Sequence, residues 1–270
     1  MRMLYLSQSL LSQALGRAVR TGAVLGLSLP MLAVAAGEGA ESSAWGLGIG
    51  AISAQKPYTG ADRENRALPL IYYENSWVRV FGPGAEVKLP RLGISDSQHI
   101  AFRLVARYDG SGYEADDAPV LGGMAKRKSG FWAGGKATWH NDIANLGAEW
   151  TADATGHSKG QRFSLSLEKN WRLGQQVMLA PRLGATWYDK KYVDYYFGVR
   201  AGETTAGRAA YSGKAGVNTE FSLRSTYLFD PRNSVFVDVG VTRLAKEIKD
   251  SPLVGRSTEN RVFMGYLYRF

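Results

Sequence analysis

The feature that most constrains the fold of this 270-residue chain is a regular alternation of apolar and polar side chains. From Phe163 to Glu168 every odd position is apolar and every even position is polar, and the segment from Val235 to Thr242 places four valines on one face. Successive side chains of a β-strand point to opposite faces, so a period of two indicates strands with one apolar and one polar face. This period dominates beyond residue 44, which predicts an all-β fold.

A membrane β-barrel explains this alternation better than a soluble sandwich of two sheets does. The alternating segments run for about 9–14 residues, whereas strands of globular proteins are commonly about 5–6 residues long. Short and long connections also follow one another in a regular order. Aromatic residues gather near the expected strand ends: Trp45, Tyr72, Tyr73, Trp77, Trp139, Trp150, Trp171, Trp187, Tyr188, Tyr227 and Phe229. Apolar outward faces, polar inward faces and aromatic rims are typical of a transmembrane antiparallel β-barrel.

The last strand of the chain supports the barrel. Alternate positions up to the C-terminus are apolar, and the final residue is aromatic: Val262, Met264, Tyr266, Tyr268 and Phe270. Outer-membrane barrels commonly end in this way, and we interpret these five residues as the signal that the barrel-assembly machinery recognises.

Twelve strands are expected, near residues 45–55, 66–74, 76–82, 84–91, 97–108, 130–140, 144–154, 160–172, 176–188, 214–229, 233–246 and 260–270. Long connections in such barrels face outward and short ones face the periplasm. With a periplasmic C-terminus, the external connections are 56–65, the turn Gly82-Pro83-Gly84, 109–129, 155–159, 189–213 and 247–259. The periplasmic turns are then Asn75, 92–96, 141–143, 173–175 and 230–232. The strands between 66 and 91 are short, so a barrel of ten strands is the alternative.

The first 36 residues have the composition of a secretory signal peptide. Arg2, Arg17 and Arg20 precede or border an apolar run that ends in Ala33-Val34-Ala35, the small-x-small pattern that a signal peptidase cuts. Removing residues 1–36 removes three arginines and no acidic residue, which lowers the formal net charge from +9 to +6. We therefore expect residues 37–270 to form a barrel in the outer membrane of a Gram-negative bacterium, in contact with lipid and lipopolysaccharide.

The inward face of the predicted barrel collects charged side chains. The candidates for lining the lumen are Arg103, Arg107, Lys136, Glu149, Glu168, Arg182, Arg224 and Asp238, and Arg261 and Arg269 share this face. One interpretation is a channel that prefers anions. The other is a closed interior in which these charges pair across neighbouring strands. Basic external segments suit the phosphates of lipopolysaccharide: Lys126-Arg127-Lys128, Lys159 and Lys190-Lys191.

The sequence gives little reason to expect an enzyme, a cofactor or a metal site. The glycines from Gly46 to Gly50 lie in an alternating strand with no following helix, so small residues in a crowded lumen explain them better than a dinucleotide loop does. The chain has no cysteine and only three histidines, none of them at metal-ligand spacing. His157 beside Ser158 is the one arrangement that suggests a hydrolase. No basic helix or stacking module indicates nucleic-acid binding.

The long connections resemble those of the MipA/OmpV family of outer-membrane proteins. The residues that carry this resemblance are Asp116, Asp117, Pro119, Leu121, Gly123, Met124, Arg127, Tyr195, Tyr196, Gly198, Val199, Ser251 and Pro252, together with Tyr211 and the closing Tyr-x-Phe. The resemblance covers essentially the whole chain from about Trp45. It implies a non-catalytic scaffold that brings a lytic murein transglycosylase together with a bifunctional murein synthase, and it implies no catalytic residues.

Three functional hypotheses follow. The first is the non-catalytic scaffold, which would contact cell-wall enzymes through its periplasmic turns, notably 92–96 and 141–143. The second is a passive pore for small solutes, involved in envelope stress or in osmotic or antibiotic responses. The third is an outer-membrane hydrolase that uses His157.

Overall fold

The computed structural model describes residues 43–270, so the predicted signal peptide lies outside the described residues. The strands are β1 (Ala44–Ala54), β2 (Glu64–Glu74), β3 (Val78–Phe81), β4 (Gly84–Lys88), β5 (Leu92–Gly93), β6 (His99–Asp109), β7 (Gly130–His140), β8 (Asn145–Asp153), β9 (Gln161–Glu168), β10 (Trp171–Leu173), β11 (Val177–Tyr188), β12 (Gly216–Leu228), β13 (Asn233–Arg243) and β14 (Thr258–Arg269). Four short helices lie between strands: η1 (Pro119–Leu121), α2 (Lys190–Phe197), η2 (Ala201–Glu203) and α3 (Lys246–Lys249).

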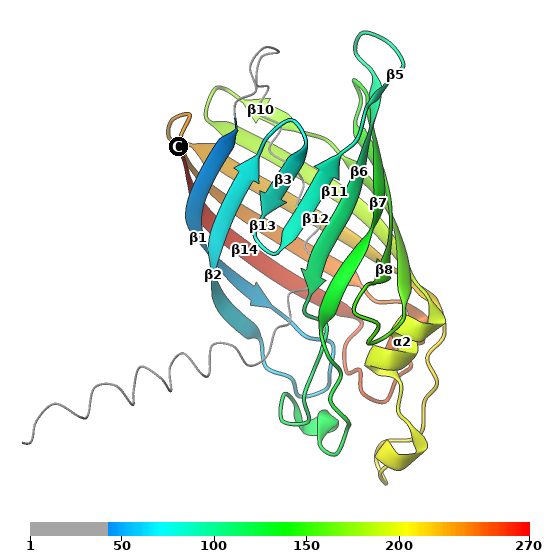
Figure 1. Ribbon diagram of the computed structural model, residues 1–270. Coiled ribbons are helices and arrows are strands. Elements are labelled where there is room, and N and C mark those ends of the chain that lie inside the picture. The colour runs from blue at the N-terminus through cyan, green and yellow to red at the C-terminus, as the bar shows by residue number, and fades with distance from the viewer. Residues whose placement is uncertain (1–42) are drawn as a thin grey trace, which may run out of the picture.

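These strands form one antiparallel sheet that closes on itself (Figure 1). The first strand, β1, pairs with the last, β14, from Gly46 opposite Arg269 to Ala54 opposite Arg261. Both β4 and β5 pair with β6, and both β9 and β10 pair with β11, so each couple forms one interrupted barrel strand. The result is the expected barrel of twelve strands. Within residues 43–270, no helix is both long and apolar enough to cross a membrane.

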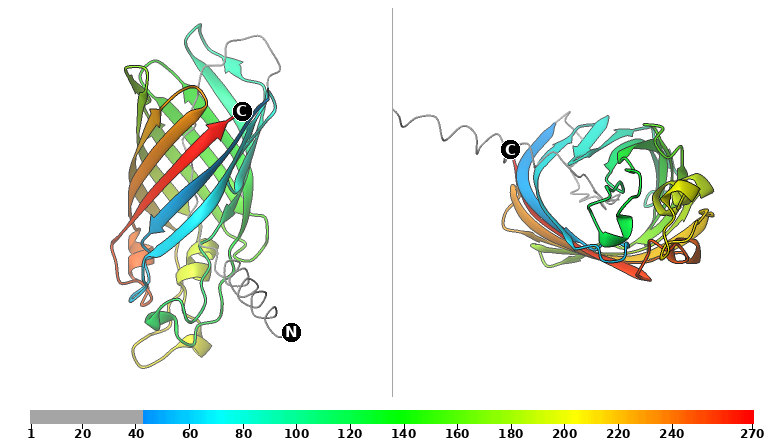
Figure 2. Two further views of the ribbon diagram at one scale, coloured as in Figure 1. Left: turned by 90° about the vertical axis from the view of Figure 1, so that its left-hand side faces the viewer. Right: turned by 90° about the horizontal axis from the view of Figure 1, so that it is seen from below.

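The two ends of the barrel differ. The C-terminus and the short connections lie at one end, which we call the turn end, and the long connections lie at the other, which we call the loop end (Figures 1 and 2). Short connections of outer-membrane barrels face the periplasm, so the turn end is the periplasmic one.

The alternation of the sequence corresponds to two faces of the wall. In β1, Leu47 and Ile49 are exposed on the outside, whereas Ile52 is buried inside. In β14, Met264 and Tyr266 are exposed, and Phe263 and Leu267, on the alternate positions, are buried. Phe270, just after β14, is also exposed. An outward apolar face with no protein against it is what contact with lipid requires. That the machinery reads these last residues stays a prediction.

The glycines of β1 are needed where the barrel closes. Gly46, Gly48 and Gly50 all point inward, and a Cβ at Gly48 would overlap the backbone carbonyl of Tyr266 in β14. At Gly50 the added atom would meet the Phe263 ring at 2.9 Å. The expectation that small residues here face a crowded lumen is therefore confirmed.

The hairpin of β3 and β4 is shorter than its neighbours and ends partway down the wall (Figure 1). At its turn, the Gly82 N–H donates to Ile71 O at 3.0 Å and Pro83 O accepts from the Tyr108 N–H at 3.0 Å. The sequence placed the Gly82-Pro83-Gly84 turn among the external connections, which is wrong. Strands of four and five residues cannot span the height that their eleven-residue neighbours span.

One edge of β2 therefore has no strand beside it. Residues 64–70 pair with β1 on one side, and on the other side no strand of the described chain reaches them. Residues two apart in an antiparallel strand direct their backbone groups to the same side. The backbone of Pro69 therefore faces the same side of β2 as Ile71 O, which accepts from Gly82, but at Pro69 that side is open. Proline offers no N–H there, which is a common protection of strand edges against pairing with other chains.

Part of the barrel interior is apolar, which the sequence did not predict. Ile52, Leu70, Phe236 and Phe263 form a buried cluster on the side of β1, β2, β13 and β14. Phe81 of β3 extends this cluster, with its ring centroid 6.5 Å from that of Phe236. The inward glycines of β1 leave room for these rings. The charged interior is thus confined to the rest of the lumen.

Candidate functional site

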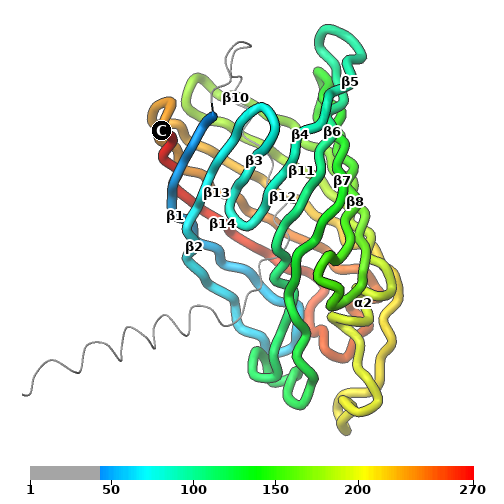
Figure 3. Tube along the Cα trace, viewed as in Figure 1, coloured from blue at the N-terminus to red at the C-terminus, as the bar shows by residue number. Residues whose placement is uncertain are grey.

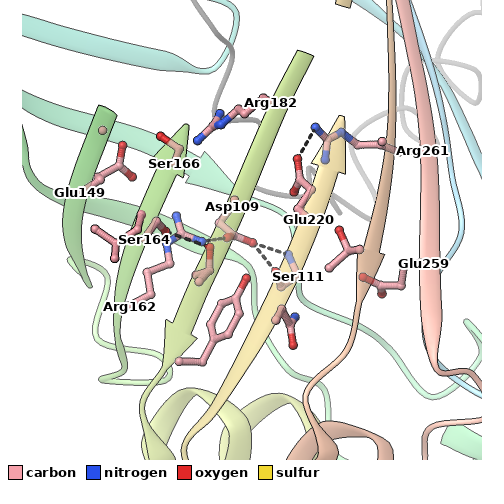
Figure 4. A pocket seen from close by; sticks show the side chains of 18 of the residues that line it. Asp109, Ser111, Glu149, Arg162, Ser164, Ser166, Arg182, Glu220, Glu259 and Arg261 are labelled. Carbon is pink, nitrogen blue, oxygen red and sulfur yellow. Dashed lines mark hydrogen bonds and ion pairs between the residues drawn. The ribbon is translucent and has the colours of Figure 1, made fainter. Parts of the chain in front are cut away.

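A polar cavity lies in the lumen between the apolar cluster and the loop end (Figure 4). It is lined by inward residues of β6 to β9 and β11 to β14, and the space between its lining atoms is about 1080 Å³ when open solvent is included. Its lining is charged and hydroxylic, with Ser111, Ser164, Ser166, Thr186 and Asn218 among the uncharged groups. This cavity is the candidate functional site.

The structure places the eight predicted lumen residues as follows. Four of them line the cavity: Arg107, Lys136, Glu149 and Arg182. The others lie nearer the turn end. Arg103 Nε is 3.6 Å from Glu86 Oε2, and Arg224 Nη2 is 2.9 Å from Asp238 Oδ2. Glu168 shares the inward face of β9 with Ser164 and Ser166 and accepts a hydrogen bond from Asn170 at 3.3 Å.

Most charges in the cavity wall are paired along the wall. Arg162 Nη1 donates to Asp109 Oδ2 at 2.5 Å, and Arg107 Nη2 donates to Glu149 Oε2 at 2.5 Å. On the other side Arg261 Nη2 donates to Glu220 Oε1 at 3.0 Å. Each of these pairs reaches past at least one intervening strand, whereas the sequence interpretation considered neighbouring strands only.

Four charged groups of the cavity were not among the predicted lumen residues: Asp109, Arg162, Glu220 and Glu259. Asp109 and Glu259 had been placed in external connections, because strand ends are hard to locate from alternation. Arg162 and Glu220 could have been found from the sequence. Arg162 lies two positions before Ser164 and Glu220 lies four positions before Arg224, and both of these partners were already on the polar, inward face.

The long connections at the loop end fold together over the barrel mouth. We call residues 55–63, 110–129, 189–215 and 244–257 the cap. They share a hydrophobic core in which Tyr113, Leu121, Tyr196, Ile248 and Leu253 are buried. Figure 2, seen from below, shows segment 110–129 in green across the opening. The cap therefore covers the mouth of the lumen.

A buried ion pair holds two segments of the cap together. Arg127 donates to both carboxylate oxygens of Glu203, at 2.9 and 2.8 Å, and its Nε donates to Tyr195 O at 2.7 Å. Both residues are almost fully buried. A two-pronged arginine–carboxylate contact fixes orientation as well as distance. Arg127 thus joins segment 110–129 to segment 189–215.

Two further polar side chains stabilise the cap through backbone carbonyls. Arg208 Nη1 donates to Val120 O at 2.5 Å and to Gly122 O at 3.0 Å. Ser251 Oγ donates to Phe197 O at 2.6 Å, which ties segment 244–257 to α2. Buried carbonyls at the ends of short helices need such donors.

Apart from the closing Tyr268-x-Phe270, which lies at the turn end, the residues that resemble the MipA/OmpV family fall in this cap. Those that are buried in it are Leu121, Met124, Arg127, Tyr196, Gly198, Val199 and Ser251. Tyr195 and Pro252 are half-buried, Pro119 begins η1, and Gly123 has a φ of +78°, which favours glycine. Asp117 Oδ2 accepts from the Glu114 N–H at 3.0 Å, and Asp116 is exposed. Their visible role is to build the cap.

Burial and hydrogen bonds act in opposite directions on Glu203. Burial alone would raise the pKa of this carboxyl group, but hydrogen bonds from Arg127 and from the backbone N–H groups of Arg200 and Ala125 lower the pKa to about 2. Burial raises the pKa of Tyr113 to about 12. The ion pair of the cap therefore stays charged over the physiological range.

Acid should loosen the cap through Glu203. Its pKa in the folded protein lies below the ordinary 4.5, so its stabilisation is complete above about pH 4.5 and is lost as the pH falls toward 2. We expect the near-ultraviolet circular dichroism of the tyrosine-rich cap to weaken over this range. A Glu203→Gln variant should show a weaker signal at pH 7 and little further change on acidification. An equal acid response in both proteins would contradict this assignment.

The histidines do not form a catalytic or metal-binding arrangement. His99 and His140 stack at the turn end with centroids 4.7 Å apart. His157 Nδ1 lies 2.9 Å from Ser129 O, and Ser158 Oγ donates to Asp153 instead of to His157. Across residues 43–270, no group of three or more potential ligands could hold a metal ion. This geometry gives the hydrolase hypothesis no support.

The chain is similar in sequence to known bacterial proteins. It is 28% identical over 236 residues to the putative outer membrane protein YiaT of Escherichia coli K12, which spans 86% of this chain and 93% of that protein. It is 24% identical over 245 residues to the MltA-interacting protein of the same strain, which spans 89% and 96%. Among solved structures, an outer membrane channel from Pseudomonas putida F1 is similar with a TM-score of 0.40 and 12% identity, covering 84% of this chain and 95% of that one.

YiaT and OmpV of Vibrio cholerae, another similar protein, are named outer membrane proteins of Gram-negative bacteria, which with the barrel fold confirms the predicted location of this chain. A family match then covers residues 47–270, almost the whole described part of the sequence. The chain belongs to the family described as MltA-interacting protein MipA.

Proposed function

We propose that this barrel is a scaffold whose turn end holds murein-processing enzymes in the periplasm. The observation that carries the proposal is segment 89–98, which projects beyond the barrel rim as an extension of β6 (Figures 1 and 3). Within it β5 pairs with the start of β6, and the Ile94 N–H donates to Gln98 O at 2.9 Å. An ordered projection gives a partner more to bind than a tight turn would.

The projection exposes apolar side chains. Leu92 and Ile94 are more than half exposed, and Ile143 in the adjacent turn is 81% exposed. Exposed tryptophans near a rim are expected in a membrane barrel, because their rings suit the membrane interface. Aliphatic side chains that project beyond the barrel rim have no such reason, and exposed apolar groups gathered in one place commonly mark a binding surface.

Three turns are joined into one surface at this end. Ser97 Oγ donates to Asp142 Oδ2 at 3.0 Å, which links segment 89–98 to the turn 141–144. Lys169 Nζ donates to Asp142 O at 2.7 Å, which adds the break between β9 and β10. A surface already ordered before binding loses less entropy when a partner binds. We call residues 89–98, 141–144 and 169–170 the turn-end surface.

The kind of partner is inferred from the family. A relative that spans most of this chain is named for its interaction with MltA. By this likeness we infer that the turn-end surface of the present chain binds a lytic murein transglycosylase and a bifunctional murein synthase.

Charges on the turn-end surface should weaken this binding. We expect the double substitution Leu92→Asp/Ile94→Asp to reduce recovery of both enzymes at least tenfold, because each lost apolar anchor costs about 1–2 kcal/mol of binding free energy. The measurement is a pull-down from detergent extracts of the envelope, with both enzymes quantified by mass spectrometry. Ala209→Asp/Ala210→Asp, which adds the same charges to exposed positions of the cap, is the matched control.

Two results would refute the proposal. One is that the unaltered chain recovers neither enzyme above background. The other is that both double variants recover the enzymes equally well, since the turn-end surface would then be irrelevant to binding.

A further inference from the structure

We propose that an opening in the barrel wall beside β2 admits one acyl chain of a membrane lipid, which packs against the apolar cluster inside the barrel. The opening lies in the loop-end half of the wall, whereas the turn-end surface lies at the opposite rim. The lipid site therefore does not depend on the scaffold role.

The wall lacks two strands on the open side of β2 (Figure 1). The hairpin of β3 and β4 ends at residues 82–83, and residues 64–70 of β2 continue toward the loop end with no strand of the described chain on that side. On the far side of the opening, β6 pairs with β4 only as far as Arg107 opposite Gly84. At the hairpin tip, β2 and β6 are three strand spacings apart, about 14 Å in all. The opening lies in the membrane-spanning wall and therefore faces lipid.

The lipid-facing surface of the barrel continues up to this opening. Leu47 of β1 pairs with Ile71 of β2, and Ile49 pairs with Pro69, next to the unpaired edge. The side chains of Leu47, Ile49 and Ile71 are exposed on the outside of the barrel. An acyl chain lying on these side chains has only to cross the edge of β2 to reach the interior. This continuity identifies a lipid of the bilayer as the occupant.

The inner surface beside the opening is apolar. Leu68 and Leu70 point inward from the unpaired part of β2, and Phe81 points inward near the hairpin tip. Leu70 is buried in the apolar cluster, whereas Leu68 and Phe81 are only partly buried against it. Lumen side chains of outer-membrane barrels are ordinarily polar. Apolar surface left uncovered beside an opening to lipid therefore indicates an apolar ligand.

A second cavity extends this apolar surface beneath the cap. It includes Ala54 of the apolar cluster, and Glu64 and residues 110–112 from the two flanks of the opening. The space between its lining atoms is about 610 Å³ when open solvent is included. The rest of its lining is mainly aromatic or aliphatic: Tyr58, Tyr188, Tyr192, Phe197, Leu244 and Ile248. A chain that passes the opening thus meets apolar side chains both in the cluster and under the cap.

The polar groups of this second cavity favour a polar ligand less than its apolar surface favours a lipid chain. Tyr58 Oη donates to a backbone carbonyl of the cap at 3.3 Å, and Lys56 Nζ lies 3.4 Å from Glu64 Oε2. Asn218 and Glu259 also line the polar lumen cavity, so they lie where the two cavities meet. Groups already paired within the protein offer little to an ion, which leaves the apolar side chains as the main contacts for a ligand.

The open edge of β2 requires a ligand that is polar at one end. Ala67 has the same parity as Ile71, so its backbone N–H and C=O point into the opening. Unpaired backbone groups are costly in lipid, and Pro69 removes one donor from this edge but also interrupts any strand that would pair there. The ester or amide groups that join acyl chains to a lipid head group offer acceptors to the remaining N–H groups. An amphiphile with its linkage at the edge and its chain inside therefore matches the opening.

Photo-cross-linking in vesicles tests the proposal on the unaltered barrel. Residues 37–270 are reconstituted into dioleoylphosphatidylcholine vesicles that contain a phosphatidylcholine with a diazirine on one acyl chain, and cross-linked residues are located by mass spectrometry. We expect cross-links at the inward residues Leu68 and Phe81, in addition to outward residues such as Ile49. Cross-links confined to outward residues would overturn the proposal. Inward cross-links that are equally frequent near the turn end would also overturn it, because entry would not then occur through the opening.

A polar side chain on the inner surface should exclude the acyl chain. Leu68→Gln is expected to lower cross-linking at Phe81 about tenfold, the effect of losing one buried leucine contact, and to leave Ile49 unchanged. Leu228→Gln, the same substitution at a partly buried inward position of β12 near the turn end, is the matched control and should leave both unchanged. Resistance to SDS at room temperature shows that each variant is folded. Parental cross-linking at Phe81 in Leu68→Gln, or an equal loss in both variants, would show that this surface does not hold the chain.

Discussion

Replacing Gly48 with valine is expected to stop the barrel from closing. Gly48 points inward from β1, and even a single Cβ there would overlap the Tyr266 carbonyl in β14. The obstacle is backbone, so no rotation of a side chain can relieve it. Overpacking against movable side chains costs about 1–3 kcal/mol, and a clash with the strand that closes the barrel should cost more.

The consequence should be visible as a loss of folded protein. A barrel in which β1 cannot pair with β14 has two open edges, and lipid cannot satisfy their backbone groups. We expect most Gly48→Val protein to migrate as unfolded chain on SDS gels without heating, whereas the parent migrates as a compact species. Ala51→Val adds the same side chain to an exposed outward position of the same strand and should leave folding intact. Equal yields of compact protein from both variants would show that Gly48 is not needed for closure.

The fold could be predicted from the sequence because a barrel wall is defined by local alternation. Each inward residue of β9, from Arg162 to Glu168, follows from its neighbours two positions away. The residues that face each other across the lumen cannot be predicted in this way. Alternation tells whether a side chain points inward or outward, but not how far along the barrel axis it lies. The contact between Phe81 and Phe236 and the pair of Arg162 with Asp109 therefore appeared only in the structure.

The contacts within the cap were even harder to predict from the sequence. Arg127 and Glu203 are 76 residues apart and lie in connections that have no regular period. The resemblance to a family drew attention to Arg127 and its neighbours, but it could not say that they bind one another across two loops. The basic segment containing Arg127 suggested contact with lipopolysaccharide phosphates. The structure instead places Arg127 inside the cap, beside Lys126 and Lys128, which are exposed.

The cap also bears on the hypothesis that the barrel is a pore. An open channel requires a continuous path along the barrel axis, and the cap lies across that path at the loop end. The apolar cluster around Phe236 fills one side of the lumen. The charged interior alone therefore does not make the barrel a channel, and a cap that opens would be required for axial conduction. The stability of the cap therefore determines whether the barrel can conduct along its axis.

Replacing Arg127 with methionine is expected to open the cap and leave the barrel folded. The substitution removes the hydrogen bonds to Tyr195 O, Ala125 O and both oxygens of Glu203. It also leaves a buried carboxylate without its counter-charge, a change that typically costs about 3–5 kcal/mol. The barrel wall shares none of these bonds, so resistance to SDS at room temperature should be unchanged.

Cleavage by chymotrypsin measures the opening, because the cap contains Tyr113, Tyr195 and Tyr196. A loss of about 3 kcal/mol in the stability of the cap should speed cleavage by about two orders of magnitude if cleavage follows the open population. Lys126→Met, the same substitution at an exposed neighbour, should leave the rate unchanged. Arg127→Met/Glu203→Gln should recover part of the protection, because removing both charges costs less than stranding one. If Arg127→Met is cleaved no faster than the parent, the ion pair does not hold the cap closed, and the role assigned to these loop residues is wrong.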